Sequence, residues 1–120
     1  MAVRGIRGAT VVGNNTPEEI LRGTRELLEA IVEANPSLIS EQIVSVIFTM
    51  TDDLDAAYPA KAARQIGWDQ IPLLCSREIA VPGSLPKCVR ILLHWNTDLT
   101  QSGIKHVYLG EAAKLRPDIS

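Results

Sequence analysis

The chain has 120 residues, a formal net charge of −2 and a sequence pI near 5.6, with 46% hydrophobic and 22% charged residues. A chain of this length has room for one core, which predicts a single domain over residues 1–120. The slightly acidic balance argues against a general nucleic-acid binder, because such proteins rely on a basic face that neutralises phosphates.

The N-terminus, the length of the apolar segments and the cysteines indicate the cellular compartment. The N-terminus lacks the continuous apolar stretch of a signal peptide, and no segment has the apolar length that spans a bilayer. Cys75 and Cys88 form no CxxC pair, so reduced thiols are the simpler interpretation. We therefore expect a cytoplasmic protein without membrane contact. A chain this small leaves much of its surface exposed, so oligomerisation would bury more of it.

The first half of the chain predicts a strand and a long helix. Residues 3–12 are rich in β-branched residues and glycine, which is typical of a strand. Thr16 is expected to cap a helix, with Glu19 completing a capping box. Apolar residues then recur at helical spacing until Pro36, before which the helix should end.

The second half predicts strands and one short helix. Residues 42–50 are rich in Val and Ile and indicate a buried strand, and a helix over 59–67 follows an acidic turn. Further strands are expected over 71–76, 87–95 and 105–109. The order β-α-β-α-β-β-β predicts an α/β (α+β) fold with a mixed sheet and helices packed mainly on one face.

Arg90 is the most informative single residue. It lies inside an apolar strand segment, where a guanidinium is costly to bury without an anion. By strand alternation Arg90 shares a face with Cys88 and Leu92, so it is not simply the polar side of a half-exposed strand. Two interpretations stay open: a ligand site, and an internal salt bridge or subunit seam, which the sequence alone favours.

Four further residues are candidates for the same site. Glycines beside Arg7 leave space for a ligand or another backbone, although an exposed edge-strand arginine is the simpler explanation for Arg7 alone. Glu78 could pair with an arginine, but Cys75 has the opposite strand parity, so one pocket for both requires a bend after Ser76. Tyr108 offers a hydroxyl, although strand tyrosines usually pack. Together these groups suit a small dianionic ligand that bears a hydroxyl.

Other kinds of site are less favoured. Asp52, Asp53 and Asp55 precede a helix, where aspartates more often serve as turn and cap residues than as metal ligands. His94 and His106 have no metal-ligand spacing, and no glycine-rich phosphate loop follows a strand. The sequence therefore favours neither a metal site nor a nucleotide enzyme.

Longer motifs run through nearly the whole chain: VRGIRGATVV, TPEEIL, FTMTDDLDAAYPAKAARQIGW, PLLCSREIAVPGSLPKCVRILLH and HVYLGEAAKLRPD. In this order and spacing they resemble the monofunctional α/β chorismate mutases. The RGxRGAT string alone is modest evidence, but its combination with YPAKAAR, CxxE, KCVR and HVYL…LRPD is highly specific. The resemblance implies a cofactor-free homotrimer with a pseudo-barrel core, which rearranges chorismate to prephenate in clefts between subunits.

The resemblance also implies roles for individual residues. Arg90 should reach the ether oxygen and the pyruvyl carboxylate, Arg7 and Tyr108 should hold that carboxylate, and Glu78, helped by Cys75, should bind the ring hydroxyl. The other implied substrate-binding residues are Tyr58, Ala60, Lys61 and Arg64 of the adjacent subunit, the strand residues Leu73 and Leu74, and Leu115 and Arg116 of the closing tail.

Two positions depart from the family pattern, and rival functions remain. Tyr58 replaces another aromatic such as Phe, and Leu74 stands where a small polar residue can occur. The rivals are a carboxylate sensor, a trimeric enamine or imine deaminase, and a purely structural trimer. Glu78 together with Arg90 favours the mutase, because a simple anion binder has little use for a buried carboxylate.

Overall fold

The structure is a computed structural model, and it describes residues 1–115. Its strands and α-helices, in chain order, are β1 (Ala2–Val11), α1 (Pro17–Ala34), β2 (Ile43–Met50), α2 (Ala60–Gln65), β3 (Leu73–Arg77), β4 (Cys88–Thr97) and β5 (Val107–Tyr108). Short 3-10 helices cover Ser40–Gln42, Gln101–Gly103 and Gly110–Leu115. The predicted order of strands and helices is confirmed. Strand β5 is shorter than predicted, Val107–Tyr108 in place of residues 105–109.

The strands form one mixed sheet with the order β3-β2-β4-β1-β5. Strand β4 is antiparallel to both β1 and β2, whereas the outer strands β3 and β5 are parallel to their neighbours. The central strand therefore carries Arg90, which lies opposite Thr49 of β2 and Ala9 of β1.

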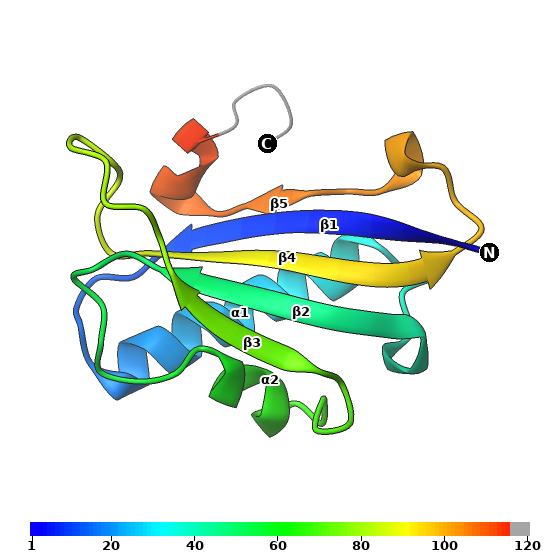
Figure 1. Ribbon diagram of the computed structural model, residues 1–120, viewed down its shortest axis with the longest axis horizontal. Helices are drawn as coiled ribbons and strands as arrows, with labels where there is room; N and C mark the ends of the chain where they lie inside the picture. The colour runs from blue at the N-terminus through cyan, green and yellow to red at the C-terminus, as the bar shows by residue number, and fades with distance from the viewer. Residues whose placement is uncertain (116–120) are drawn as a thin grey trace.

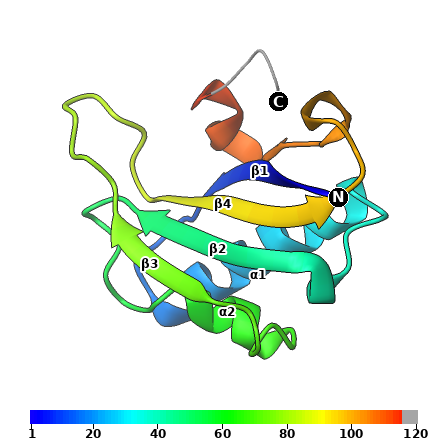
Figure 2. The same ribbon diagram turned by 45° about the vertical axis from the view of Figure 1, so that its right-hand side comes forward.

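Both α-helices pack on the same face of this sheet (Figures 1 and 2). The strand residues on that face are buried and form the main core with the apolar side of α1. The members of this core with no exposed surface include Ile6, Leu27, Leu28, Ile31, Val46, Phe48 and Leu93. We call this the covered face. Within residues 1–115, no α-helix covers the opposite, open face, which confirms the prediction of helices mainly on one side.

Helix α1 begins as the sequence predicts, but only half of the capping box forms. The Thr16 hydroxyl accepts a hydrogen bond from the Glu19 N–H at 3.2 Å. The predicted return bond is wrong, because the Thr16 N–H donates to the carbonyl of Asn14 and the Glu19 carboxylate accepts from Gly13 instead. The helix is amphipathic. Among residues 1–115, none of the helices combines the length and the apolar character of a membrane span.

Gly8 brings α1 close to the sheet. A Cβ atom at this position would lie 2.9 Å from Ile31 Cδ1 and 3.2 Å from the carbonyl oxygen of Val107. The glycine next to Arg7 therefore makes room for the helix and for β5, not for a ligand.

Candidate active site

Arg90 lines a small cavity on the open face and has an acidic partner there. Its Nη1 atom lies 3.5 Å from Glu78 Oε1, and the side chains of Arg90 and Glu78 are 38% and 25% exposed. The cavity holds about 120 Å³, and its lining includes Arg90, Glu78, Cys88 and Leu115. The ion pair and the open pocket coexist, so the two interpretations of Arg90 do not exclude each other.

Two hydrogen bonds fix Glu78 beside Arg90. Glu78 follows the end of β3, and its N–H donates to the carbonyl of Met50 at 2.9 Å. The Thr49 hydroxyl donates to Glu78 Oε2. Sequence reasoning missed Thr49, although a hydroxyl near the end of an otherwise apolar strand was an available signal. Because Thr49 lies opposite Arg90, it turns the carboxylate toward the open face.

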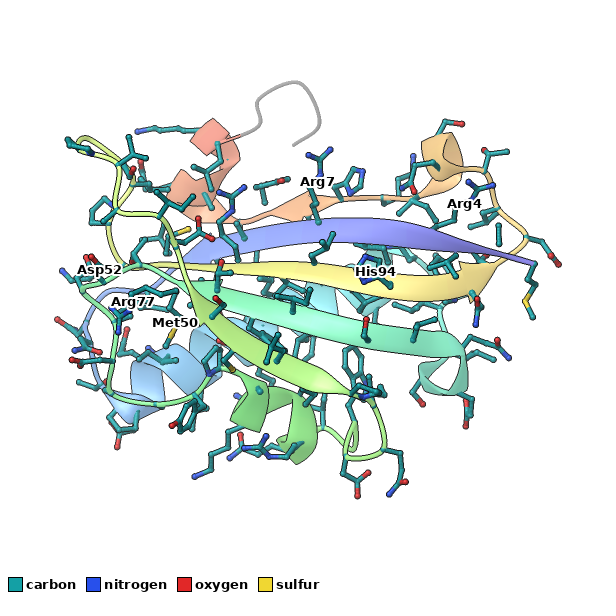
Figure 3. The ribbon with its side chains drawn as sticks, in the orientation of Figure 1. Arg4, Arg7, Met50, Asp52, Arg77 and His94 are labelled. Carbon is teal, nitrogen blue, oxygen red and sulfur yellow. The ribbon has the colours of Figure 1, made fainter. Side chains whose placement is uncertain are left out.

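Arg7 lies on the same face as Arg90, one strand away. Ala9 is opposite Arg90 and Arg7 is opposite Leu92, so the two arginines are diagonal neighbours on adjacent strands. The Arg7 backbone N–H donates to His106 Nδ1 at 2.9 Å. Figure 3 shows the Arg7 side chain extending from β1 toward β5. The open face thus presents two guanidinium groups to one region.

Tyr108 contributes a buried hydroxyl to the part of the open face that carries Arg90. It pairs with Ala9 and is 8% exposed. Its hydroxyl is buried and has no hydrogen-bond partner among residues 1–115. An unsatisfied buried hydroxyl costs roughly 1–3 kcal/mol, which a bound acceptor such as a carboxylate would offset.

Cys88 forms an apolar wall of the Arg90 cavity. It packs with Ala9, Tyr108 and Ala112, and Leu115 packs against this cluster. Burial is the main cause that raises the pKa of the Cys88 thiol to about 11. At neutral pH the thiol is therefore protonated and leaves the charge balance to Arg90 and Glu78.

Cys75 lies on the other side of the sheet. It pairs with Phe48 of β2 and packs partly against the main core. It lines a larger cavity of about 460 Å³ together with Tyr58, Arg77 and the segment 54–57. In Figure 3 Arg77 lies beside Asp52 at the ends of β2 and β3, and their atoms Nη1 and Oδ1 are 3.2 Å apart. Within one chain Cys75 and Glu78 therefore open onto different cavities, and the turn after Ser76 does not unite them.

The remaining site residues predicted from the resemblance are spread over both sides of the sheet. Tyr58 is 73% exposed, and Lys61 and Arg64 are exposed on α2. Ala60 is 5% exposed and Leu73 packs partly against the core, so neither side chain faces freely outward. Leu74 is 62% exposed on the open face, and Leu115 lines the Arg90 cavity. Arg116 lies outside the described residues.

The geometry offers charge and hydrogen bonding rather than metal chemistry. Among residues 1–115, no three His, Cys, Asp or Glu side chains are placed to hold a metal ion. The polar groups that line the Arg90 cavity are the Arg90 cation, the Glu78 carboxylate and the hydroxyls of Thr51 and Ser84. Such a set can bind an anion and stabilise developing charge.

Comparisons with known proteins agree with this chemistry. Residues 3–119 match the family model for chorismate mutase type I. The chain is 56% identical over 117 residues to the chorismate mutase AroH of Thermus thermophilus, covering 98% of this chain and 96% of that protein. It is 46% identical over 121 residues to the chorismate mutase AroH of Bacillus subtilis, covering 100% and 94% of the two chains.

A solved structure extends the likeness to the backbone. A chorismate mutase from Clostridium thermocellum superposes with a TM-score of 0.89 at 52% identity, covering 92% of this chain and 97% of that one. The family model and both curated relatives match nearly the whole chain, and the chain therefore belongs to the type I chorismate mutase family.

Proposed function

We propose that the chain, as a chorismate mutase, converts chorismate to prephenate at the Arg90 cavity, and that a second copy in a cytoplasmic homotrimer completes each site. The observation that carries this proposal is the pairing of Arg90 with Glu78 in an open cavity, 3.5 Å apart. Such a pair offers a cation to an anionic substrate and a carboxylate acceptor to its ring hydroxyl.

The reaction needs charge stabilisation and orientation, and the cavity can supply both. In this [3,3] rearrangement the C–O bond breaks before the new C–C bond is complete, so negative charge develops on the ether oxygen. Arg90 is held on the central strand and places a fixed positive charge beside the ether oxygen. Arg7 and the buried Tyr108 hydroxyl hold the pyruvyl carboxylate, which keeps the reacting carbons together. The step forms no covalent intermediate and requires no cofactor.

The open face supports assembly into a trimer. It exposes large apolar side chains, with Val3 at 53%, Leu74 at 62% and Leu92 at 37%. A small chain gains stability when such a face packs against neighbouring copies, and three sheets packed in this way give the pseudo-barrel core.

A site shared between copies also accounts for the scattered residues. Lys61 and Arg64 do not line the Arg90 cavity of their own chain, and Tyr58 shares its cavity with Cys75. In the proposed trimer this second group, Cys75 included, faces the Arg90 cavity of the next copy. There Lys61 and Arg64, three residues apart on α2, present cations to the ring carboxylate. Leu115, which lines the Arg90 cavity, closes one side of the site.

The first experiment follows the loss of chorismate absorbance with the purified protein beside an Arg90→Ala control. Rapid conversion to prephenate that is lost in the control is the expected result. A folded trimer that converts no chorismate would overturn the proposal and favour a carboxylate-binding protein instead.

Mixed trimers test whether the site is shared. Arg90→Ala and Arg64→Ala chains are each expected to be nearly inactive as homotrimers. Every trimer that contains both kinds of chain regains one intact interface, so a random equal mixture should recover about a quarter of wild-type activity. No recovery in mixtures with verified subunit exchange would place both residues in the same chain's site.

A further inference from the structure

Asn15 joins two segments that are distant in the sequence. It lies between β1 and α1, and its side chain reaches the segment between β2 and α2. Its Nδ2 atom donates to Asp55 Oδ1 at 2.8 Å. Its Oδ1 atom accepts from the N–H groups of Asp55 and Ala56 at 3.0 and 3.1 Å. One carboxamide therefore satisfies two backbone donors and one carboxylate.

The segment that Asn15 holds forms a wall of the larger cavity and ends at Tyr58. Residues 54–58 all line that cavity. The Tyr58 carbonyl accepts from the Lys61 N–H at 3.1 Å, where α2 begins. The backbone that carries Tyr58 is thus anchored on one side by α2 and on the other by Asn15. The Tyr58 side chain is 73% exposed, so packing within its own chain does little to hold it.

We propose that Asn15 is a positioning residue that fixes the Asp55–Tyr58 segment and so sets the affinity for substrate. The inference rests on the proposed function, in which Tyr58 lines the site of the neighbouring copy. Asn15 acts on binding rather than on the chemical step, because Arg90 and Glu78 supply the charges for that step and the Asp55–Tyr58 segment lines a different cavity within one chain. Loss of the Asn15 hydrogen bonds should therefore raise KM and leave kcat nearly unchanged.

An exchange of the two side chains tests the hydrogen bonds themselves. Asn15→Asp keeps an oxygen that accepts from the two N–H groups. It replaces the Nδ2 donor with a carboxylate oxygen, which faces the carboxylate of Asp55. Asp55→Asn keeps an acceptor for the Asn15 amide and serves as the matched control. The double variant N15D/D55N restores all three bonds with the side-chain donor reversed, and its net charge equals that of the wild type.

The expected results are specific to each variant. Asn15→Asp should raise KM about tenfold with kcat within about twofold, whereas Asp55→Asn alone and the double variant should stay within about twofold of wild type. If Asn15→Asp does not fold, Asn15→Ala takes its place, with an expected rise in KM of about fivefold. An unchanged KM in a folded Asn15 variant, or no rescue in the double variant, overturns the proposal.

A second double-mutant cycle, between Asn15 and Tyr58, separates a positioning role of Asn15 from a general structural role. In a Tyr58→Ala background, Asn15→Asp should change KM by no more than about twofold, because the side chain it positions is gone. Fully additive effects on KM, or a kcat that falls in step with the melting temperature, would show that Asn15 only stabilises the fold. If the wild-type protein itself converts no chorismate, the proposed function fails first, and that result is distinct from these.

Discussion

The two faces of the sheet use the same strands for different purposes. On the covered face Phe48, Ile91 and Leu93 are at most 3% exposed and pack beneath the helices. On the open face Arg90 and Leu92 alternate with them along β4 and remain accessible. Strand alternation thus lets one segment supply both core and site. A change at Arg90 should therefore lower activity with little effect on stability, and a change at Ile91 should lower stability with little effect on activity.

The largest effect is expected from a charge on the open face. Leu92→Asp would bury an unpaired carboxylate in the proposed subunit contact, which costs several kcal/mol. We expect a folded monomer with at least a ~100-fold loss of activity, measured by light scattering and chorismate turnover. Glu29→Lys, on the exposed side of α1, is the control and should remain trimeric. An active trimer with Asp at position 92 would mean that subunits meet elsewhere.

Replacing the charge of Arg90 should affect catalysis without affecting the fold. A citrulline at this position keeps the shape but not the cation, and should raise the barrier by at least ~3 kcal/mol, or ~100-fold in rate. The melting temperature should change little, since the side chain is 38% exposed. Near-normal turnover of the citrulline protein would refute the electrostatic role.

Its neighbour on the covered face should show the reverse. Ile91→Val removes one buried methyl group, so the free energy of unfolding should fall by about 1 kcal/mol while kcat stays unchanged. Denaturant titration at a fixed protein concentration measures this loss, because the proposed assembly would add a concentration-dependent contribution to stability. A fall in kcat without a fall in stability would show that the two faces are not independent.

The smallest effect on stability should come from Asp53, in the segment between β2 and α2. Desolvation raises its pKa, but hydrogen bonds from the Thr51 hydroxyl and the Lys87 N–H hold the pKa below its ordinary value of 3.8. The unfolded chain thus binds the proton first, so the contribution is present at neutral pH and is lost as pH falls below about 4.

Asp53→Asn measures that contribution. The variant should be less stable at pH 7 by no more than about 1 kcal/mol, because the carboxylate is exposed. Thermal unfolding at pH 7 and pH 3 should show the difference from wild type shrinking at the lower pH. A gap that widens in acid would contradict the assigned sign.

Local signals in the sequence predicted most of the fold. Thr16 and the helical spacing that follows it placed the start of α1 correctly, and strand alternation grouped Arg90 with Cys88 and Leu92 on one face of a strand. The structure shows that this face lies opposite the main core. The Glu19 half of the capping box failed because Gly13, a residue before the helix, offered a competing donor. A competition of that kind depends on the path of the loop, which spacing alone does not define.

Contacts across the sheet could not be predicted in the same way. Thr49 reaches Glu78 from 29 residues away, and Asn15 reaches Asp55 from 40 residues away. Neither partner follows from periodicity, because each depends on which strands become neighbours. Sequence parity did correctly separate Cys75 from Glu78, and the geometry places Cys75 in the cavity of Tyr58.

The position of β4 has a consequence for how the site responds to substrate. Arg90 lies on a strand with hydrogen-bonded neighbours on both sides, whereas Glu78 follows β3, the edge of the sheet. Amide protons of β4 should exchange with deuterium only when the whole sheet opens, and those after residue 78 through local fluctuations. The strand that carries the cation is therefore the more rigid of the two, and the backbone that follows Glu78 is where the site can adjust to the substrate.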